Sequence, residues 1–276
     1  MPWKLYVDSR KRQPGARGDS DTSFAIALPF PISAKGKALV DTVLLPNSAY
    51  TIRAGENDKF YTDELVGQNG RIVTLPQGQY TVTELQAALQ TAMNGAGKQI
   101  SGTYVVTYNE TTNRLVITMA NAAAGDQFRV WPQKMLEENA GLWNLTRDTL
   151  YSANFPLGFV EGDVQLSGPT VTSPNAPNVQ PYSQLFIRSN LGQASTESLG
   201  PNYENDIVRR IIVGNTPANS MVIDQLATEA DCMKFDGSQE FSLLWFEILD
   251  HNSRVVNTHG LPVSFSIIFK EVDDPY

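Results

Sequence analysis

The chain has 276 residues, of which 41% are hydrophobic and 18% are charged. This length fits one large all-β domain or two ordinary domains, and the composition allows a sizeable core and excludes wholesale disorder. The net charge of −8 argues against a general nucleic-acid-binding protein. A single cysteine, Cys232, excludes an intrachain disulfide and is typical of folding in a reducing compartment.

The charge is uneven along the chain. Residues 1–17 contain five basic residues and one acidic residue, a local balance of +4. They are Lys4, Arg10, Lys11, Arg12 and Arg17, against Asp8. This pattern predicts a short basic arm on an acidic body, which is either a solvated segment or an assembly arm that contacts a neighbouring subunit. Any contact with nucleic acid is expected through this arm alone.

The first 75 residues consist of short β-rich runs bounded by Gly, Pro, Asn and Asp. The expected strands are residues 3–9, 23–30, 38–45, 49–54 and 70–75. In the second of these, alternate apolar residues form one face. Little of this region has helical periodicity, so we interpret residues 1–75 as the first part of a β-sandwich.

Residues 79–97 change this pattern and predict an amphipathic helix. From Leu85 onward, apolar residues recur at i, i+3, i+4, i+7 and i+8, which places them on one helix face. Thr83 is the predicted N-cap, and Gln86 completes the predicted capping box three residues later.

The helix is followed by further elements of a compact α/β unit. They are a hairpin of residues 103–108 and 114–119, a strand at 127–131 and a short helix at 134–141. We therefore predict an inserted α/β subdomain at residues 76–147, and residues 148–276 as the second part of the sandwich.

The remaining residues return to β-rich sequence. The stretch 167–182 is rich in Pro, Ser, Thr and Asn and predicts an extended loop. Strands are expected at residues 183–191, 206–214, 241–250 and 261–272. The most apolar stretch, residues 241–249, is too short to span a bilayer and contains Glu247, so no membrane insertion is expected.

No catalytic, cofactor or metal signature stands out, and we expect no enzyme activity and no cofactor. His251 and His259 are too few for a zinc triad without carboxylates, and His251 falls in an expected turn. Cys232 is interpreted as a small buried hydrophobic residue. Trp131 and Trp143 are compatible either with a sugar site or with packing of the subdomain.

The order of these segments resembles a known family of viral proteins. The phrases are "LYVDSRKR", "DTSFAIALPFPI" and "ALVDTVLLPNSAYTI" near the N-terminus, "GQYTVTELQAALQTAMN" and "VVTYNETTNRLVITM" in the insertion, and "LFIRSNL" and "LLWFEILDHNSRVV" later. Together they resemble the penton-type minor capsid proteins of the double-jelly-roll virus lineage. That lineage includes virophages and Polinton-like viruses, with the adenovirus penton base as a relative by architecture.

This resemblance implies a mainly β fold, a single jelly-roll β-sandwich interrupted by a small α/β insertion. It further implies a homopentamer that plugs the five-fold vertices of an icosahedral capsid and contacts the major capsid protein. The protein would be made in the host cytoplasm or nucleus and would reside in the virion. Such contacts need no catalytic residues.

The tripeptide Arg17-Gly18-Asp19 is the motif that many adhesion receptors bind. It lies in a polar segment that contains Gly and Pro, as an accessible motif should. Short motifs also occur by chance, so it is either a receptor-binding site or an incidental turn.

Two other function classes remain open from the sequence. One is a β-sandwich receptor- or glycan-binding module on a virion or phage tail. The other is a glycoside hydrolase on a β-rich scaffold, since its carboxylates leave little trace in a single sequence.

Overall fold

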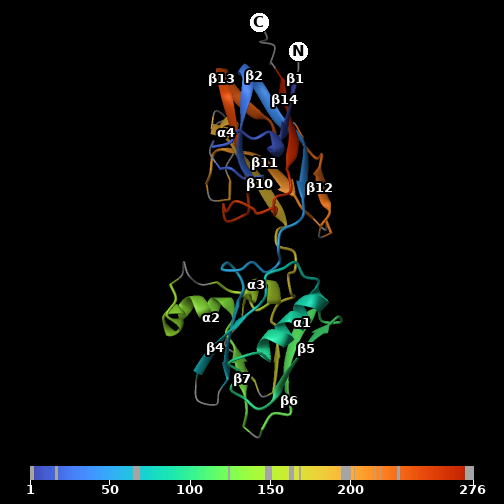
Figure 1. Ribbon diagram of the computed structural model, residues 1–276, viewed down its shortest axis with the longest axis vertical. Coiled ribbons are helices and arrows are strands. Elements are labelled where there is room, and N and C mark those ends of the chain that lie inside the picture. Colours follow the sequence, from blue (N-terminus) through green and yellow to red (C-terminus); the bar gives the residue numbers. More distant parts are fainter. Residues whose placement is uncertain are drawn as a thin grey trace. The chain divides into compact units, whose positions relative to one another are not determined.

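The computed structural model describes residues 3–15, 18–64, 69–123, 125–146, 151–161, 165–167, 169–193, 200–201, 203–214, 216–217, 219–228 and 231–270. The chain forms two compact units (Figure 1). Unit 1 comprises Met1–Ala49 and Tyr182–Tyr276, and unit 2 comprises Tyr50–Pro181. The chain is therefore a β-rich unit interrupted by a smaller mixed unit, as the sequence predicted.

The bounds of the insertion differ from the predicted 76–147, because unit 2 begins at Tyr50 and ends at Pro181. The expected strand at 49–54 forms only an isolated bridge, between Ile52 and Gly78. The expected strand at 70–75 pairs within unit 2. The Pro-rich segment contributes a short strand that pairs with the insertion's hairpin. Local patterns showed the elements but not which sheet each one joins.

Unit 1 is an antiparallel β-structure. Its strands are β1 (Trp3–Asp8), β2 (Ser23–Pro46), β10 (Gln184–Ser189), β11 (Ile207–Ile212), β12 (Met221–Asp224), β13 (Met233–Leu249) and β14 (Ser264–Lys270). Two short helical turns, η1 (Ser9–Lys11) and α4 (Asn190–Gln193), accompany them. The strand order is β1-β14-β2-β13-β10-β11, and β12 also pairs with β2.

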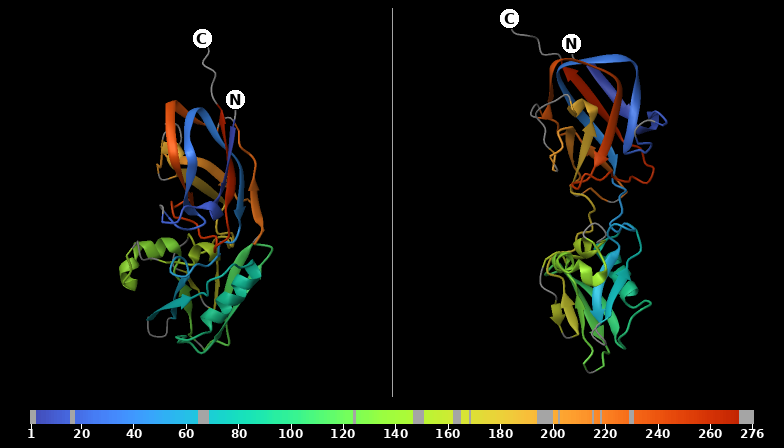
Figure 2. Two further views of the ribbon diagram at one scale, coloured as in Figure 1. Left: turned by 45° about the horizontal axis from the view of Figure 1, so that its top comes forward. Right: turned by 90° about the vertical axis from the view of Figure 1, so that its left-hand side faces the viewer.

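Strand β2 belongs to both layers of this sandwich. Its C-terminal part pairs with β14 and β12, and its N-terminal part pairs with β13. One layer is therefore β1-β14-β2-β12 and the other is β2-β13-β10-β11. The right-hand view of Figure 2 shows the blue ribbon of β2 turning over one end of unit 1.

The two strands expected at 23–30 and 38–45 are thus one strand of 24 residues. Pro29 and Pro31 lie at an irregularity, where pairing with β13 passes from Ala27 opposite Leu243 to Ile32. Proline is tolerated there because its missing N–H is not needed for the ladder. Further along, β2 bends at Gly36, whose φ of +86° favours glycine.

The core of unit 1 joins the two layers through aromatic side chains. Phe246 of β13 meets Phe265 of β14 edge to face, with ring centroids 4.9 Å apart. Phe24 of β2 lies 5.7 Å from Phe246 in the same cluster. Edge-to-face pairs add about 0.5–1.5 kcal/mol beyond the burial of their area, so these rings contribute strongly to holding the layers together.

Unit 2 has its own strands and helices. They are β3 (Lys59–Glu64), β4 (Asn69–Thr74), α1 (Val82–Met93), β5 (Thr103–Asn109), β6 (Arg114–Ala120), β7 (Phe128–Val130), α2 (Gln133–Glu138), η2 (Ala140–Trp143), α3 (Asn154–Leu157), β8 (Gln165–Ser167) and β9 (Thr170–Thr172). The strands form two sheets, β4-β3-β7-β8 and β5-β6-β9. The predicted hairpin is the pair β5 and β6.

Helix α1 packs its apolar stripe into the core of unit 2. Leu85, Leu89 and Met93 are fully buried, as the periodicity predicted. The start of the helix is corrected, however, because its N-cap is Thr81 and Glu84 completes the capping box. Two overlapping Thr-x-x-Glu/Gln patterns stand in this sequence, and the helix uses the earlier one.

A buried ion pair links the two sheets and α1. The Glu64 carboxylate is fully buried and accepts hydrogen bonds from Arg71 (2.8 Å) and from the Tyr104 hydroxyl (3.0 Å). The Arg71 guanidinium also donates to the carbonyl of Met93, at the C-terminal end of α1. Burial, together with the nearby Glu64 charge, raises the pKa of Tyr104.

Replacing Arg71 with Met should destabilise unit 2 by about 3–5 kcal/mol, because Glu64 would remain buried without its counter-charge. Urea denaturation followed by circular dichroism would measure this change. The control is Arg10→Met, which removes the exposed pair of Arg10 with Asp8 and should leave the free energy of unfolding nearly unchanged, because solvent screens that pair. Equal losses from both substitutions would contradict the role given to the buried pair.

Candidate functional site

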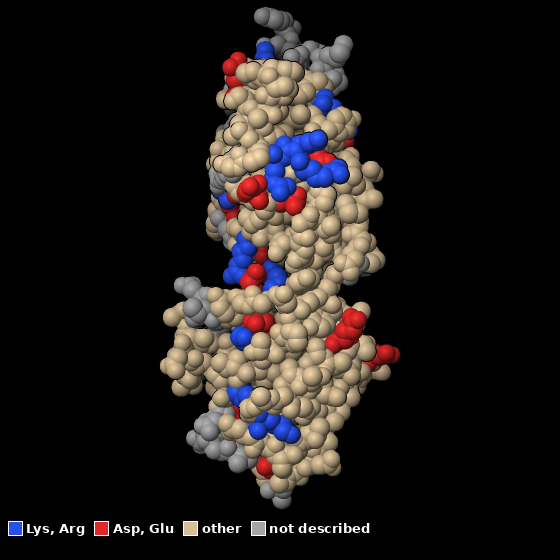
Figure 3. Space-filling model, in the orientation of Figure 1, with Lys and Arg blue, Asp and Glu red and all other residues tan. Residues whose placement is uncertain are grey.

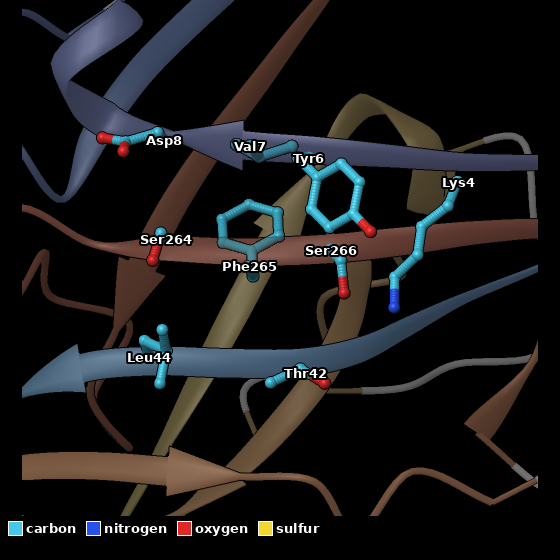
Figure 4. A pocket seen from close by; sticks show the side chains of 9 residues that line it. All are labelled: Lys4, Tyr6, Val7, Asp8, Thr42, Leu44, Ser264, Phe265 and Ser266. Carbon is cyan, nitrogen blue, oxygen red and sulfur yellow. The ribbon is translucent and has the colours of Figure 1, made fainter.

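A groove lies on the outer face of unit 1, over strand β14. Its volume is about 370 Å³. Figure 4 shows Lys4 and Tyr6 of β1 on one side and Thr42 and Leu44 of β2 on the other, with β14 between them. The rest of the lining consists of Val7, Asp8, Ser264, Phe265 and Ser266.

The groove follows from the sizes of the side chains on three neighbouring strands. Successive residues of a strand point to opposite faces, so Ser264 and Ser266 face outward while Phe265 packs in the core. Tyr6 lies opposite Ser266, and Leu44 lies opposite Ser264. A strand with small outward side chains therefore runs between two strands with large ones.

Apolar surface continues from the groove onto strand β12. Ile223 lies opposite Leu44 in the register of β12 and β2, and their exposed fractions are 62% and 37%. Met221 of β12 is also exposed. An antiparallel sheet that faces solvent normally carries polar side chains on that face. Clustered exposed apolar residues are instead typical of an interaction surface.

The ionic groups of the groove are paired with one another. At one end, Lys4 Nζ lies 2.6 Å from Asp41 Oδ2, and this hydrogen bond holds the pKa of Asp41 below its usual value. At the other end, Arg10 donates to Asp8 and lowers the pKa of that carboxyl in the same way. Both carboxylates thus stay ionised opposite a cation. Figure 3 shows basic and acidic side chains beside one another on unit 1.

The predicted basic arm is part of the folded unit over residues 3–12. Lys4 lies in β1, which pairs along its length with β14. Arg10 and Lys11 lie in η1, where Lys11 is exposed. Arg12 donates from Nε to Asp19 (3.0 Å) and from Nη1 to Asp21 (3.1 Å). The role of these residues in assembly remains a prediction.

The Arg-Gly-Asp motif is described only in part, because Arg17 lies outside the described residues. Gly18 has φ +63°, and a Cβ there would come within 1.9 Å of Ser23 Oγ, so this position requires glycine. The Asp19 side chain is 59% exposed while paired with Arg12. A receptor could reach this carboxylate but would compete with Arg12 for it.

The residues weighed for chemistry lie at separate positions in unit 1. His251 lies in the turn after β13, with its Nε2 3.1 Å from the side-chain nitrogen of Asn252, and His259 lies in a second turn. Cys232 is half-buried. In the described part of the chain, no three His, Cys, Asp or Glu side chains are grouped to hold a metal ion.

The two tryptophans of the insertion pack with each other. Trp131 and Trp143 meet edge to face at 5.8 Å, and Tyr61 packs against Trp143. The Trp131 indole N–H donates to Asp63 (2.9 Å). Trp143 also lies directly over Gly70, where a Cβ would clash with its ring. This aromatic cluster, which also includes Leu136, attaches α2 and η2 to the β3-β4 hairpin.

Sequence reasoning missed the groove and the strand β12. The sequence shows the alternation Ser264-Phe265-Ser266. The groove, however, forms only because Tyr6 and Leu44 lie on the two neighbouring strands, and the sequence does not show which strands are neighbours. Strand β12 has four residues and falls below the length at which a pattern can be recognised. Among the described residues, no helix is both long enough and apolar enough to cross a bilayer.

No protein-family model matches the chain, and no curated protein sequence matches it. Among solved structures, the crystal structure of the selenomethionine-labelled mavirus penton protein is similar, with a TM-score of 0.55 and 12% sequence identity. The match covers 99% of this chain and 100% of that chain, so it includes both units. The chain therefore has the fold of the penton-type single jelly-roll proteins, interrupted by an insertion.

Proposed function

We propose that the protein is a structural virion protein, a penton that occupies the five-fold vertices of an icosahedral capsid as a homopentamer. The observation that carries this proposal is the similarity to the mavirus penton protein over nearly the full length of both chains. The role is structural and not enzymatic. The proposal extends to contact with the major capsid protein and to synthesis in the host cytoplasm or nucleus.

The surface of unit 1 supports this role. A cyclic ring needs side surfaces on which neighbouring subunits lose water and bury apolar area. The groove and the exposed residues of β12 supply apolar area of this kind. Contact with nucleic acid is no part of the proposal, since Lys4, Arg10 and Arg12 all pair with carboxylates.

The mass of the purified protein in solution tests the proposal. We expect a particle of ~152 kDa, five copies of the 30.4 kDa chain, by size-exclusion chromatography with light scattering. Because a ring dissociates on dilution by mass action, the mass is measured over a range of concentrations. A mass of one chain at every concentration up to that of a concentrated stock would contradict the proposed homopentamer.

Attachment to a host adhesion receptor through Arg17-Gly18-Asp19 is the second candidate function. The observation that favours it is the exposed carboxylate of Asp19 on a loop before β2. On a ring, five copies of the motif would bind a cell surface with avidity. If the motif binds a receptor, the ion pair of Arg12 with Asp19 weakens that binding, because Arg12 competes with the receptor for the Asp19 carboxylate.

The receptor candidate predicts different effects for two substitutions. Asp19→Glu should abolish cell attachment, because the carboxylate is displaced by one methylene, whereas Arg12→Gln should preserve or increase it by releasing Asp19. Binding of fluorescent protein to cells, with and without a soluble Arg-Gly-Asp peptide, measures both. Attachment that is unchanged in Asp19→Glu would contradict this function.

A further inference from the structure

The outer face of the layer β1-β14-β2-β12 is unusual for a surface that meets only water. Tyr6, Leu44, Ile223 and Met221 expose between 37% and 76% of their surface. Tyr6 and Leu44 line the groove, and Ile223 of β12 lies beside Leu44 and continues that wall. Apolar residues around a small pocket have the make-up of the central part of a protein interface.

The charge of the chain indicates where a second copy could approach. Each chain carries a net charge of −8, so two copies repel each other except where charges are neutralised locally. Charges are neutralised in this way at the groove, because Lys4 pairs with Asp41 and Arg10 pairs with Asp8. The centre between these pairs is neutral and accepts a neutral apolar group without leaving a buried charge unpaired.

The same chain carries an apolar projection of matching character. Phe30 is 68% exposed and stands between Pro29 and Pro31, where β2 bulges away from β13. Proline fixes its own φ and holds the preceding residue extended, so this segment is rigid before any contact forms. A rigid aromatic side chain loses little entropy on binding and is a frequent anchor of protein interfaces.

The groove and the projection lie in different layers of the sandwich. The groove is formed by β1, β14 and the C-terminal part of β2, whereas Phe30 lies in the N-terminal part that pairs with β13. A closed head-to-tail ring requires this arrangement, because each subunit must present one surface to one neighbour and a different surface to the other. A two-fold dimer would instead use one surface twice.

We propose that the groove over β14 receives the Phe30 projection of a second copy of this chain, and that this contact closes the ring. The inference rests on the proposed homopentamer and names the surfaces that form it. Phe30 enters between Tyr6 and Leu44, above the outward serines of β14. The apolar residues of β12 border this contact.

Two interface variants and one control test the proposal. The projection variant is Phe30→Glu. The groove variant is Tyr6→Glu/Leu44→Glu. The control is Ile72→Glu, a similarly exposed apolar residue on β4 in unit 2. Each keeps its fold if its far-ultraviolet circular dichroism spectrum equals that of the wild type; the urea midpoint is unsuitable here, because a ring that dissociates loses the stabilisation that association supplies. Should the groove variant unfold, Tyr6→Ser replaces it, because that side chain is 76% exposed.

We expect each interface variant alone to have the mass of one chain, ~30 kDa, while the control keeps the ring mass. A 1:1 mixture of the two variants should give a heterodimer of ~61 kDa, two copies of 30.4 kDa, and nothing larger. The reason is that each variant retains one intact surface, and only one junction can form between them.

The proposal would be overturned if either interface variant still formed rings. It would also be overturned if the Ile72→Glu control dissociated, because the loss of rings would then result from the added charge and not from the loss of this contact. A mixture that stays monomeric would show that groove and projection are not partners. These outcomes differ from a failure of the proposed function, in which the wild type itself forms no ring.

Discussion

Strand β2 is the element on which the rest of unit 1 depends. It pairs with β13 in one layer and with β14 and β12 in the other, so its backbone hydrogen bonds join both halves of the sandwich. The contact of Phe246 with Phe265 then closes the core between the layers. Because both the groove wall at Leu44 and the projection at Phe30 belong to β2, this strand also fixes where two copies can meet.

Unit 2 is stabilised independently, which explains how it can interrupt the sandwich. It has its own core around α1 and a buried ion pair of Glu64 with Arg71 that joins strand and helix. Removing one partner of such a pair leaves a buried charge without a counter-charge, so both residues are needed once the pair is present. The chain passes from unit 1 into unit 2 at residues 49–50 and returns at residues 181–182. Both positions lie outside strands, after β2 and before β10, so the insertion interrupts neither strand.

Much of the fold could be predicted from sequence, and the reasons for the failures are physical. Alternation and helical periodicity identified β14, the hairpin of β5 and β6, and the buried face of α1. The prolines around Phe30 and the glycine at 36 suggested separate strands, yet a bulge and a bend accommodate them within β2. The groove could not be predicted, because it depends on which strands are neighbours: Tyr6 and Leu44 are 38 residues apart and meet only across β14.

The proposed function requires that copies of this chain form a five-fold ring. Single-particle electron microscopy of the purified protein tests it most directly, since it reports the symmetry as well as the number of subunits. A homopentamer should give class averages with five-fold symmetry in which unit 1 forms the ring contacts. Single particles without symmetry, or closed rings of another order, would contradict it.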